Sequence, residues 1–108
     1  MMADENIKKL EEADFDTGIS SGVTLVDFYA DWCGPCRMLG PVLAQVAQDV
    51  KGKAVVAKLD IDQAQKVTED LQITSVPTLI LFKDGKEAKR IVGLRDADFI
   101  TGFVLSVC

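Results

Sequence analysis

The apolar run from Val23 to Tyr29 constrains the fold of this chain more than any other feature of its sequence. Consecutive rather than alternating apolar residues are typical of a strand that is buried on both faces. A helical pattern follows almost at once, because apolar residues recur at helical spacing between Gly34 and Val50. The sequence therefore predicts an α/β fold in which a buried strand leads directly into a helix.

The rest of the chain continues this alternation. The expected strands are 7–10, 23–29, 55–61, 78–82 and 87–92, and the expected helices are 13–19, 34–50, 64–71 and 96–107. Asp84-Gly85 is a strong hairpin signal, so the last strand should return antiparallel to the one before it. In the last helix, Phe99, Phe103 and Val107 form an apolar stripe. We expect a central mixed five-stranded β-sheet with about four helices on its two faces.

Length, composition and charge narrow the class of protein. A chain of 108 residues, 48% hydrophobic and 27% charged, predicts one globular domain over residues 1–108. The net charge of -5 argues against binding to nucleic acid or to an anionic membrane. The start of the chain lacks the pattern of a secretory signal, and no apolar run is long enough to span a bilayer. These features predict a cytoplasmic protein.

The cysteines at positions 33, 36 and 108 are an odd number, which argues against a fully paired secreted framework. A structural zinc site usually has four cysteine or histidine ligands, and this chain has no histidine. One chain therefore cannot supply such a site, and we expect no metal. An iron–sulfur cluster bridging two chains would need only two thiols from each and stays open.

Cys33 and Cys36 stand at the expected strand-to-helix junction. They could be two buried structural cysteines, because cysteine is among the most buried residue types. The start of a helix, however, favours a thiolate, and Pro35 suits its first turn. A spacing of three places the two thiols within bridging distance. The pattern therefore favours a reversible disulfide with an exposed thiol, Cys33, and an inner thiol, Cys36.

Asp27 interrupts the buried strand with a carboxyl group, on the same face as Leu25 and Tyr29. If it is buried, its pKa should rise towards neutrality, and it could accept a proton from the inner thiol. Alternatively, it turns towards solvent or caps a backbone group. The sequence pattern alone leaves both interpretations open.

The residues Trp32-Cys33-Gly34-Pro35-Cys36 are the active-site sequence of thioredoxins. The resemblance to this family extends to Val-Asp-Phe-Tyr-Ala-Asp at 26–31, Lys-Leu-Asp-Ile-Asp at 58–62 and Ile-Thr-Ser-Val-Pro-Thr at 73–78. It covers nearly the whole chain, although Tyr29 stands where many members carry tryptophan. The resemblance implies a thioredoxin fold and a thiol–disulfide oxidoreductase, specifically a protein-disulfide reductase.

The resemblance also implies roles for individual residues. Cys33 would attack a target disulfide, and Cys36 would release the reduced target from the mixed disulfide. Asp27 would be the base for Cys36, with Lys58 as its charge partner. Pro77 would be cis and Val76 would pair with substrate, although an ordinary trans proline is the more frequent state for an isolated X-Pro bond. The implied docking surface consists of Trp32, Gly34, Pro35, Val76, Pro77 and Gly93.

As implied by the resemblance, the protein would bind no cofactor, and a thioredoxin reductase would supply its electrons from NADPH. Its targets would be disulfide-containing proteins such as ribonucleotide reductase, peroxiredoxins and methionine sulfoxide reductase, and it would act as a monomer. The alternative is a non-redox binding or scaffold subunit on the same fold. A third class, oxidases and isomerases, is less well matched by Gly34-Pro35 between the cysteines.

Cys108 has two interpretations. It either continues the line of Ile100 and Val104 along the last helix as a small apolar residue, or it is a regulatory or dimer-forming thiol.

Overall fold

The structure, a computed structural model, describes residues 6–108. The strands are β1 (Ile7–Leu10), β2 (Val23–Tyr29), β3 (Val55–Asp60), β4 (Thr78–Lys83) and β5 (Lys86–Val92). The helices are α1 (Phe15–Gly18), α2 (Gly34–Asp49), α3 (Gln65–Asp70) and α4 (Ala97–Leu105), with the 3-10 helices η2 (Glu12–Asp14) and η3 (Ile61–Gln63). The first five residues, on which part of the expected signal-free start depends, lie outside the described range.

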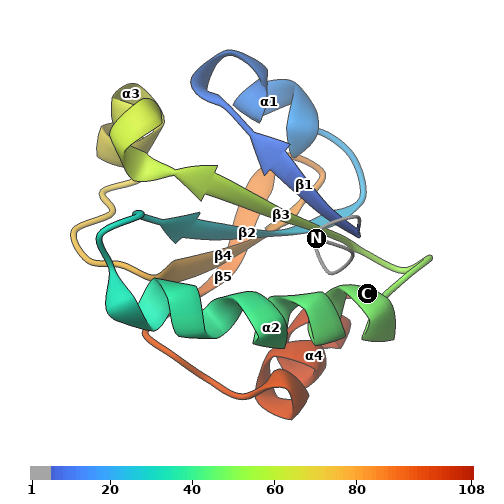
Figure 1. Cartoon of the computed structure of the whole chain (residues 1–108). Helices are drawn as coiled ribbons and strands as arrows, with labels where there is room; N and C mark the ends of the chain where they lie inside the picture. Colours follow the sequence, from blue (N-terminus) through green and yellow to red (C-terminus); the bar gives the residue numbers. More distant parts are fainter. Residues whose placement is uncertain (1–5) are drawn as a thin grey trace.

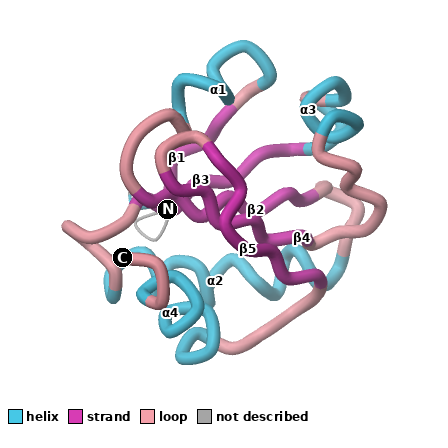
Figure 2. The backbone as a smooth tube through the Cα atoms, turned by 180° about the vertical axis from the view of Figure 1, so that it is seen from behind, coloured by secondary structure: helices cyan, strands magenta, loops and turns pink. Residues whose placement is uncertain are grey.

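The strands form one sheet in the order β1-β3-β2-β4-β5, with β2 at its centre. β2 pairs with β3 in parallel and with β4 antiparallel, and β4 pairs with β5 antiparallel. The helices α2 and α4 cover one face, and α1 and α3 cover the other (Figures 1 and 2). The predicted mixed sheet with helices on both faces is confirmed.

Each face of the sheet has its own apolar core, because successive residues of a strand point to opposite sides. On the α2 and α4 face, Leu25 packs with Leu39, Leu43, Ile100 and Val104. The opposite core includes an aromatic cluster of Phe15, Phe28 and Phe82. The ring centroids of Phe15 lie 6.1 Å from Phe28 and 5.6 Å from Phe82. The two cores together bury β2 on both of its faces.

The strands expected at 7–10 and 23–29 have the expected bounds, and the other elements differ at one or both ends. Two of these differences have a clear local cause. The helix expected at 13–19 is divided into η2 and α1, where the Asp14 carboxylate accepts a hydrogen bond from the N–H of Glu11 at 2.7 Å. The strand expected to reach Ile61 ends at Asp60. Asp60 accepts a hydrogen bond from the N–H of Asp62 at 2.9 Å, and this side-chain cap begins η3.

The expected stripe on the last helix is wrong in part. Ile100 and Val104 are the fully buried residues of α4, whereas Phe99 is 51% exposed. One residue turns an α-helix by about 100°, so Phe99 cannot share the face of Ile100. Phe103 and Val107 pack only at the margin of the core.

Within residues 6–108, no helix combines the length and the apolar character needed to cross a membrane.

Candidate active site

The site begins where β2 delivers the chain to α2. Cys33 is the N-cap of α2, with extended backbone angles of φ -94° and ψ 114°, and Gly34-Pro35 opens the helix. The N–H of Cys36 donates a hydrogen bond to Sγ of Cys33 at 3.2 Å. A sulfur that accepts this N–H at a helix start is stabilised as a thiolate when the protein is reduced.

Cys33 and Cys36 form a disulfide, with their Cα atoms 5.3 Å apart. Their exposed fractions are 5% and 6%, so the expectation of one exposed and one inner thiol is wrong for the oxidised protein. Ala30 and the half-buried Tyr29, Ile61 and Val76 pack around the pair. Sequence spacing could not show this cover, because Ile61 and Val76 come from distant segments. The two sulfurs differ instead in position, since only Cys33 caps the helix.

The segment before β4 lies against Cys33. The Val76–Pro77 peptide bond is cis, as the resemblance implied. The carbonyl oxygen of Val76 lies 3.8 Å from Sγ of Cys33. The N–H of Gly93 donates to the carbonyl of Pro77 at 2.9 Å, so the end of β5 also reaches this region. The fold thus brings Cys33, Val76, Pro77 and Gly93 together from three segments.

The side chain of Trp32 is 67% exposed, next to the start of α2. Its indole N–H donates to the Asp62 carboxylate at 3.0 Å, which fixes the ring beside Cys33. Pro35 is exposed and Gly34 half-buried on the same turn.

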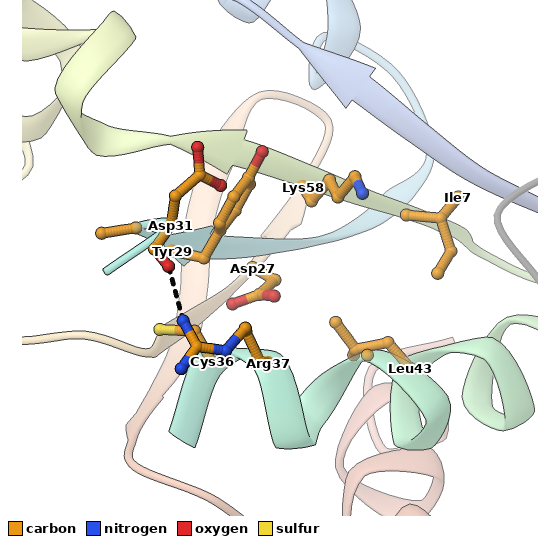
Figure 3. A pocket seen from close by; sticks show the side chains of 10 residues that line it. Ile7, Asp27, Tyr29, Asp31, Cys36, Arg37, Leu43 and Lys58 are labelled. Carbon is orange, nitrogen blue, oxygen red and sulfur yellow. Dashed lines mark hydrogen bonds between the residues drawn. The ribbon is translucent and has the colours of Figure 1, made fainter. Parts of the chain in front are cut away.

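Asp27 is only 4% exposed, and the interpretation that it turns towards solvent is wrong. It lines a cavity of about 200 Å³ together with Cys36 and Lys58. Figure 3 shows its carboxyl group in the space between α2 and β3. Oδ1 of Asp27 has no hydrogen-bond partner among residues 6–108. The carboxyl group of Asp27 is therefore buried, has no hydrogen bond to Oδ1 from the described residues, and lines the same cavity as Cys36.

Burial raises the pKa of Asp27 from 3.8 to about 7, and the charge of Lys58 opposes part of this rise. A buried carboxylate loses hydration, which favours the protonated form, while a nearby cation favours the ionised form. Asp27 therefore exchanges its proton near neutral pH, where a thiol must also lose one.

Two further residues that line this cavity, Arg37 and Tyr29, were not predicted as site residues from the sequence. Arg37 lines it, and its Nη1 donates to the carbonyl of Asp31 at 2.8 Å. Tyr29 lines it too, and Nζ of Lys58 lies 5.7 Å from the centroid of its ring. The position of Tyr29 two residues after Asp27 on one strand face was the available signal. For Arg37, the only available signal in the sequence was its position directly after Cys36.

Within the described range, no group of three or more Asp, Glu, Cys or His side chains is arranged to hold a metal ion.

A family model described as thioredoxin matches residues 6–106. The chain belongs to the thioredoxin family. It is similar to a thioredoxin of Chlamydia pneumoniae, with 46% identity over 98 residues that cover 91% of this chain and 95% of the relative. A thioredoxin of Staphylococcus aureus is 48% identical over 89 residues, covering 82% and 86%.

Among solved structures, a mutant thioredoxin from Halobacterium salinarum NRC-1 matches with a TM-score of 0.85 and 38% identity, covering 94% of this chain and 89% of that one. The predicted thioredoxin fold is thereby confirmed. Together with the Cys33–Cys36 disulfide, membership of the thioredoxin family makes the chain a thiol–disulfide oxidoreductase that reduces protein disulfides. A purely non-redox scaffold is not favoured.

Proposed function

We propose that this thioredoxin-family chain carries electrons from an NADPH-dependent thioredoxin reductase to the disulfides of target proteins, with Cys33 as the attacking thiol and Cys36 as the resolving thiol. One observation carries the proposal. The Cys33–Cys36 disulfide caps the start of α2, and the buried Asp27 carboxyl shares a cavity with Cys36 and Lys58.

In the first step, the Cys33 thiolate attacks one sulfur of the target disulfide. A bond forms between Cys33 and that sulfur, the target S–S bond breaks, and the leaving target sulfur takes a proton from water. The N-terminus of α2 and the N–H of Cys36, 3.2 Å from Sγ of Cys33, stabilise the attacking anion. The fold thus stabilises a thiolate on Cys33, which makes Cys33 the attacking thiol.

In the second step, Cys36 gives its proton to the Asp27 carboxylate and attacks Sγ of Cys33. The bond between Cys33 and the target breaks, and the second target sulfur leaves and takes up a proton. The target has gained two electrons and two protons, and Cys33 and Cys36 are joined again. Asp27 suits this role because its pKa of about 7 lets it accept a proton at neutral pH.

The target is proposed to dock on the surface around Cys33. The Val76 carbonyl, 3.8 Å from the sulfur of Cys33, is positioned to accept a backbone hydrogen bond from an extended target segment. The surface comprises Trp32, Gly34, Pro35, Val76, Pro77 and Gly93. The exposed indole of Trp32 supplies its largest apolar side chain.

The cellular setting follows the family. We propose a cytoplasmic monomer without a bound cofactor, recharged by thioredoxin reductase. Ribonucleotide reductase, peroxiredoxins and methionine sulfoxide reductase are the proposed targets.

Single-cysteine variants test the assignment. Cys36→Ser should accumulate a mixed disulfide with a model disulfide protein, because its resolving thiol is missing, whereas Cys33→Ser should accumulate none. Non-reducing electrophoresis and mass spectrometry identify the linked cysteine. In parallel, the double variant should lose NADPH-coupled reduction in the presence of a thioredoxin reductase. Coupled activity that survives in the double variant would overturn the proposal.

A further inference from the structure

Arg95 follows β5 and folds back over the end of that strand. Its Nη1 donates to the carbonyl of Val92 at 3.2 Å and to the carbonyl of Leu94 at 3.1 Å. These carbonyls belong to the residues on either side of Gly93. Gly93 has a φ of +99°, and a Cβ placed there would lie 3.3 Å from Nη1 of Arg95. The guanidinium therefore brackets Gly93 in close contact.

Gly93 connects Arg95 to the site, because its N–H donates to the carbonyl of Pro77 at 2.9 Å. The residue before Pro77, Val76, carries the carbonyl that lies 3.8 Å from Sγ of Cys33. Three contacts and the Val76–Pro77 peptide bond thus connect Arg95 to the reactive sulfur. It stands at the margin of the surface on which the target is proposed to dock.

The guanidinium is held in place on its other side by an aromatic ring. Its central carbon lies 5.6 Å from the ring centroid of Phe99. A stacked arginine keeps the N–H groups at its edge available for hydrogen bonds. Among residues 6–108, the structure gives Nε and Nη2 of Arg95 no hydrogen-bond partner and no carboxylate within ion-pair distance. A positioned cation with unused donors is suited to bind a carboxylate from outside.

Two acidic residues, Asp96 and Asp98, follow Arg95 closely in the chain and could in principle neutralise its charge. The Asp96 carboxylate is engaged at the N-cap of α4, where it accepts the N–H of Phe99 at 2.8 Å. Asp98 is an exposed residue in the first turn of α4. With a net charge of -5 on the whole chain, the general field repels an acidic target. Attraction must therefore come from the directed N–H groups of Arg95.

We propose that Arg95 determines specificity in this oxidoreductase by favouring target disulfides that have an Asp or Glu side chain close to the attacked cysteine. This inference rests on the proposed function, in which the target segment crosses Val76, Pro77 and Gly93. The target carboxylate accepts hydrogen bonds from the unused donors of Arg95. The exposed side chains of Val92, Leu94 and Phe99 exclude part of the water around the pair.

Matched disulfide peptides test the inference. One peptide carries Glu two residues on either side of a cysteine, and the other carries Gln at the same positions. Second-order rate constants for their reduction by the fully reduced protein are measured at low salt. The wild type should reduce the Glu peptide about two- to fivefold faster than the Gln peptide, and added salt should lower this ratio. The ratio should fall to one or below in Arg95→Gln, because only the repulsion from the net negative charge remains, and it should fall further in Arg95→Glu.

Lys86→Gln is the matched control. It removes the same charge from the other end of β5, about 20 Å away, and should keep the wild-type ratio. An equal fall in the control would show a general charge effect and overturn the role of Arg95. A wild-type ratio of one, with normal reduction of the Gln peptide, would overturn the inference and leave the proposed function standing. Failure to reduce either peptide would overturn both.

Discussion

Asp27 and Lys58 are partners in the register of the parallel strands β2 and β3, and both line the cavity that reaches Cys36. Their relationship sets the charge of the site. Burial raises the pKa of the carboxyl, the charge of Lys58 lowers it, and the larger effect of burial leaves the pKa at about 7. A base with a pKa near the working pH is both available and strong enough to take a proton from a thiol.

Removing the Asp27 carboxyl should stabilise the protein in a pH-dependent way. In the unfolded chain the group ionises near its ordinary pKa of 3.8, whereas in the folded chain it holds its proton to about pH 7. Between these values the unfolded state binds fewer protons, so the wild type loses stability as the pH rises. The difference in free energy of unfolding between Asp27→Ala and the wild type should therefore grow from pH 4 to pH 8 in favour of the variant, by about 4 kcal/mol at most.

Denaturant unfolding of the two oxidised proteins across this pH range measures the difference. Asp27→Asn is the matched control, since it keeps the side-chain volume but cannot ionise. Its free energy of unfolding should depend on pH in the same way as that of Asp27→Ala. A difference that stays constant with pH would place the titrating group elsewhere.

The same substitution should slow one chemical step. Asp27→Ala leaves the first attack by Cys33 largely intact but removes the proton acceptor of Cys36, so the mixed disulfide should persist about a hundredfold longer near neutral pH. Rapid mixing with a slowly resolving substrate, followed by acid quench and mass spectrometry, gives its lifetime. Resolution at the wild-type rate would assign Asp27 a structural role only.

Lys58 should control the pH at which resolution becomes fast. Lys58→Met removes the charge that lowers the pKa of Asp27, so this pKa should rise above about 7. Less carboxylate is then present at neutral pH, and the pH profile of resolution should shift upwards. Lys51→Met, which removes an exposed charge beyond the end of α2, should leave the profile unchanged. An unchanged profile in Lys58→Met would separate Lys58 from the proton transfer.

Cys33 should react first with an alkylating reagent in the reduced protein near neutral pH. Both cysteines are similarly buried in the disulfide form, so access alone does not distinguish them. The difference comes from the N-cap position, where the N–H of Cys36 stabilises an anion on Cys33. Iodoacetamide labelling followed by peptide mass spectrometry reports the order, and faster labelling of Cys36 would reverse the assignment.

The features that the sequence predicted correctly are those with a local physical cause. The apolar run at 23–29 could be buried only inside a sheet, and β2 is the central strand. Asp84 and Gly85 have φ values of 51° and 87°, which is the positive-φ geometry that an Asp-Gly hairpin turn requires. Likewise, Gly34-Pro35 after Cys33 marked the start of α2.

The features that it missed depend on contacts between distant segments. Cys33 is covered partly by Val76, which is 43 residues away in the chain. The burial of Asp27 required α2 to close over β2, and a strand pattern alone is equally consistent with an exposed carboxylate. The contact between Arg95 and Gly93 is local in sequence, but its meaning depends on the hydrogen bond from Gly93 to Pro77.

Cys108 should be dispensable for disulfide reduction. Its Sγ donates to the carbonyls of Val104 at 3.5 Å and Lys53 at 3.7 Å, which places it beyond the C-terminal end of α2. Cys33 lies at the other end of this 16-residue helix, about 24 Å away along its axis. Cys108→Ser should therefore keep the steady-state reductase rate, measured in the NADPH-coupled assay.

The exposed thiol of Cys108 should nevertheless link two molecules under oxidising conditions, since terminal turns open readily. Non-reducing electrophoresis should show this dimer for the wild type and not for the variant. A tenfold loss of activity in Cys108→Ser, about 1.4 kcal/mol of barrier, would show that this thiol takes part in the reaction.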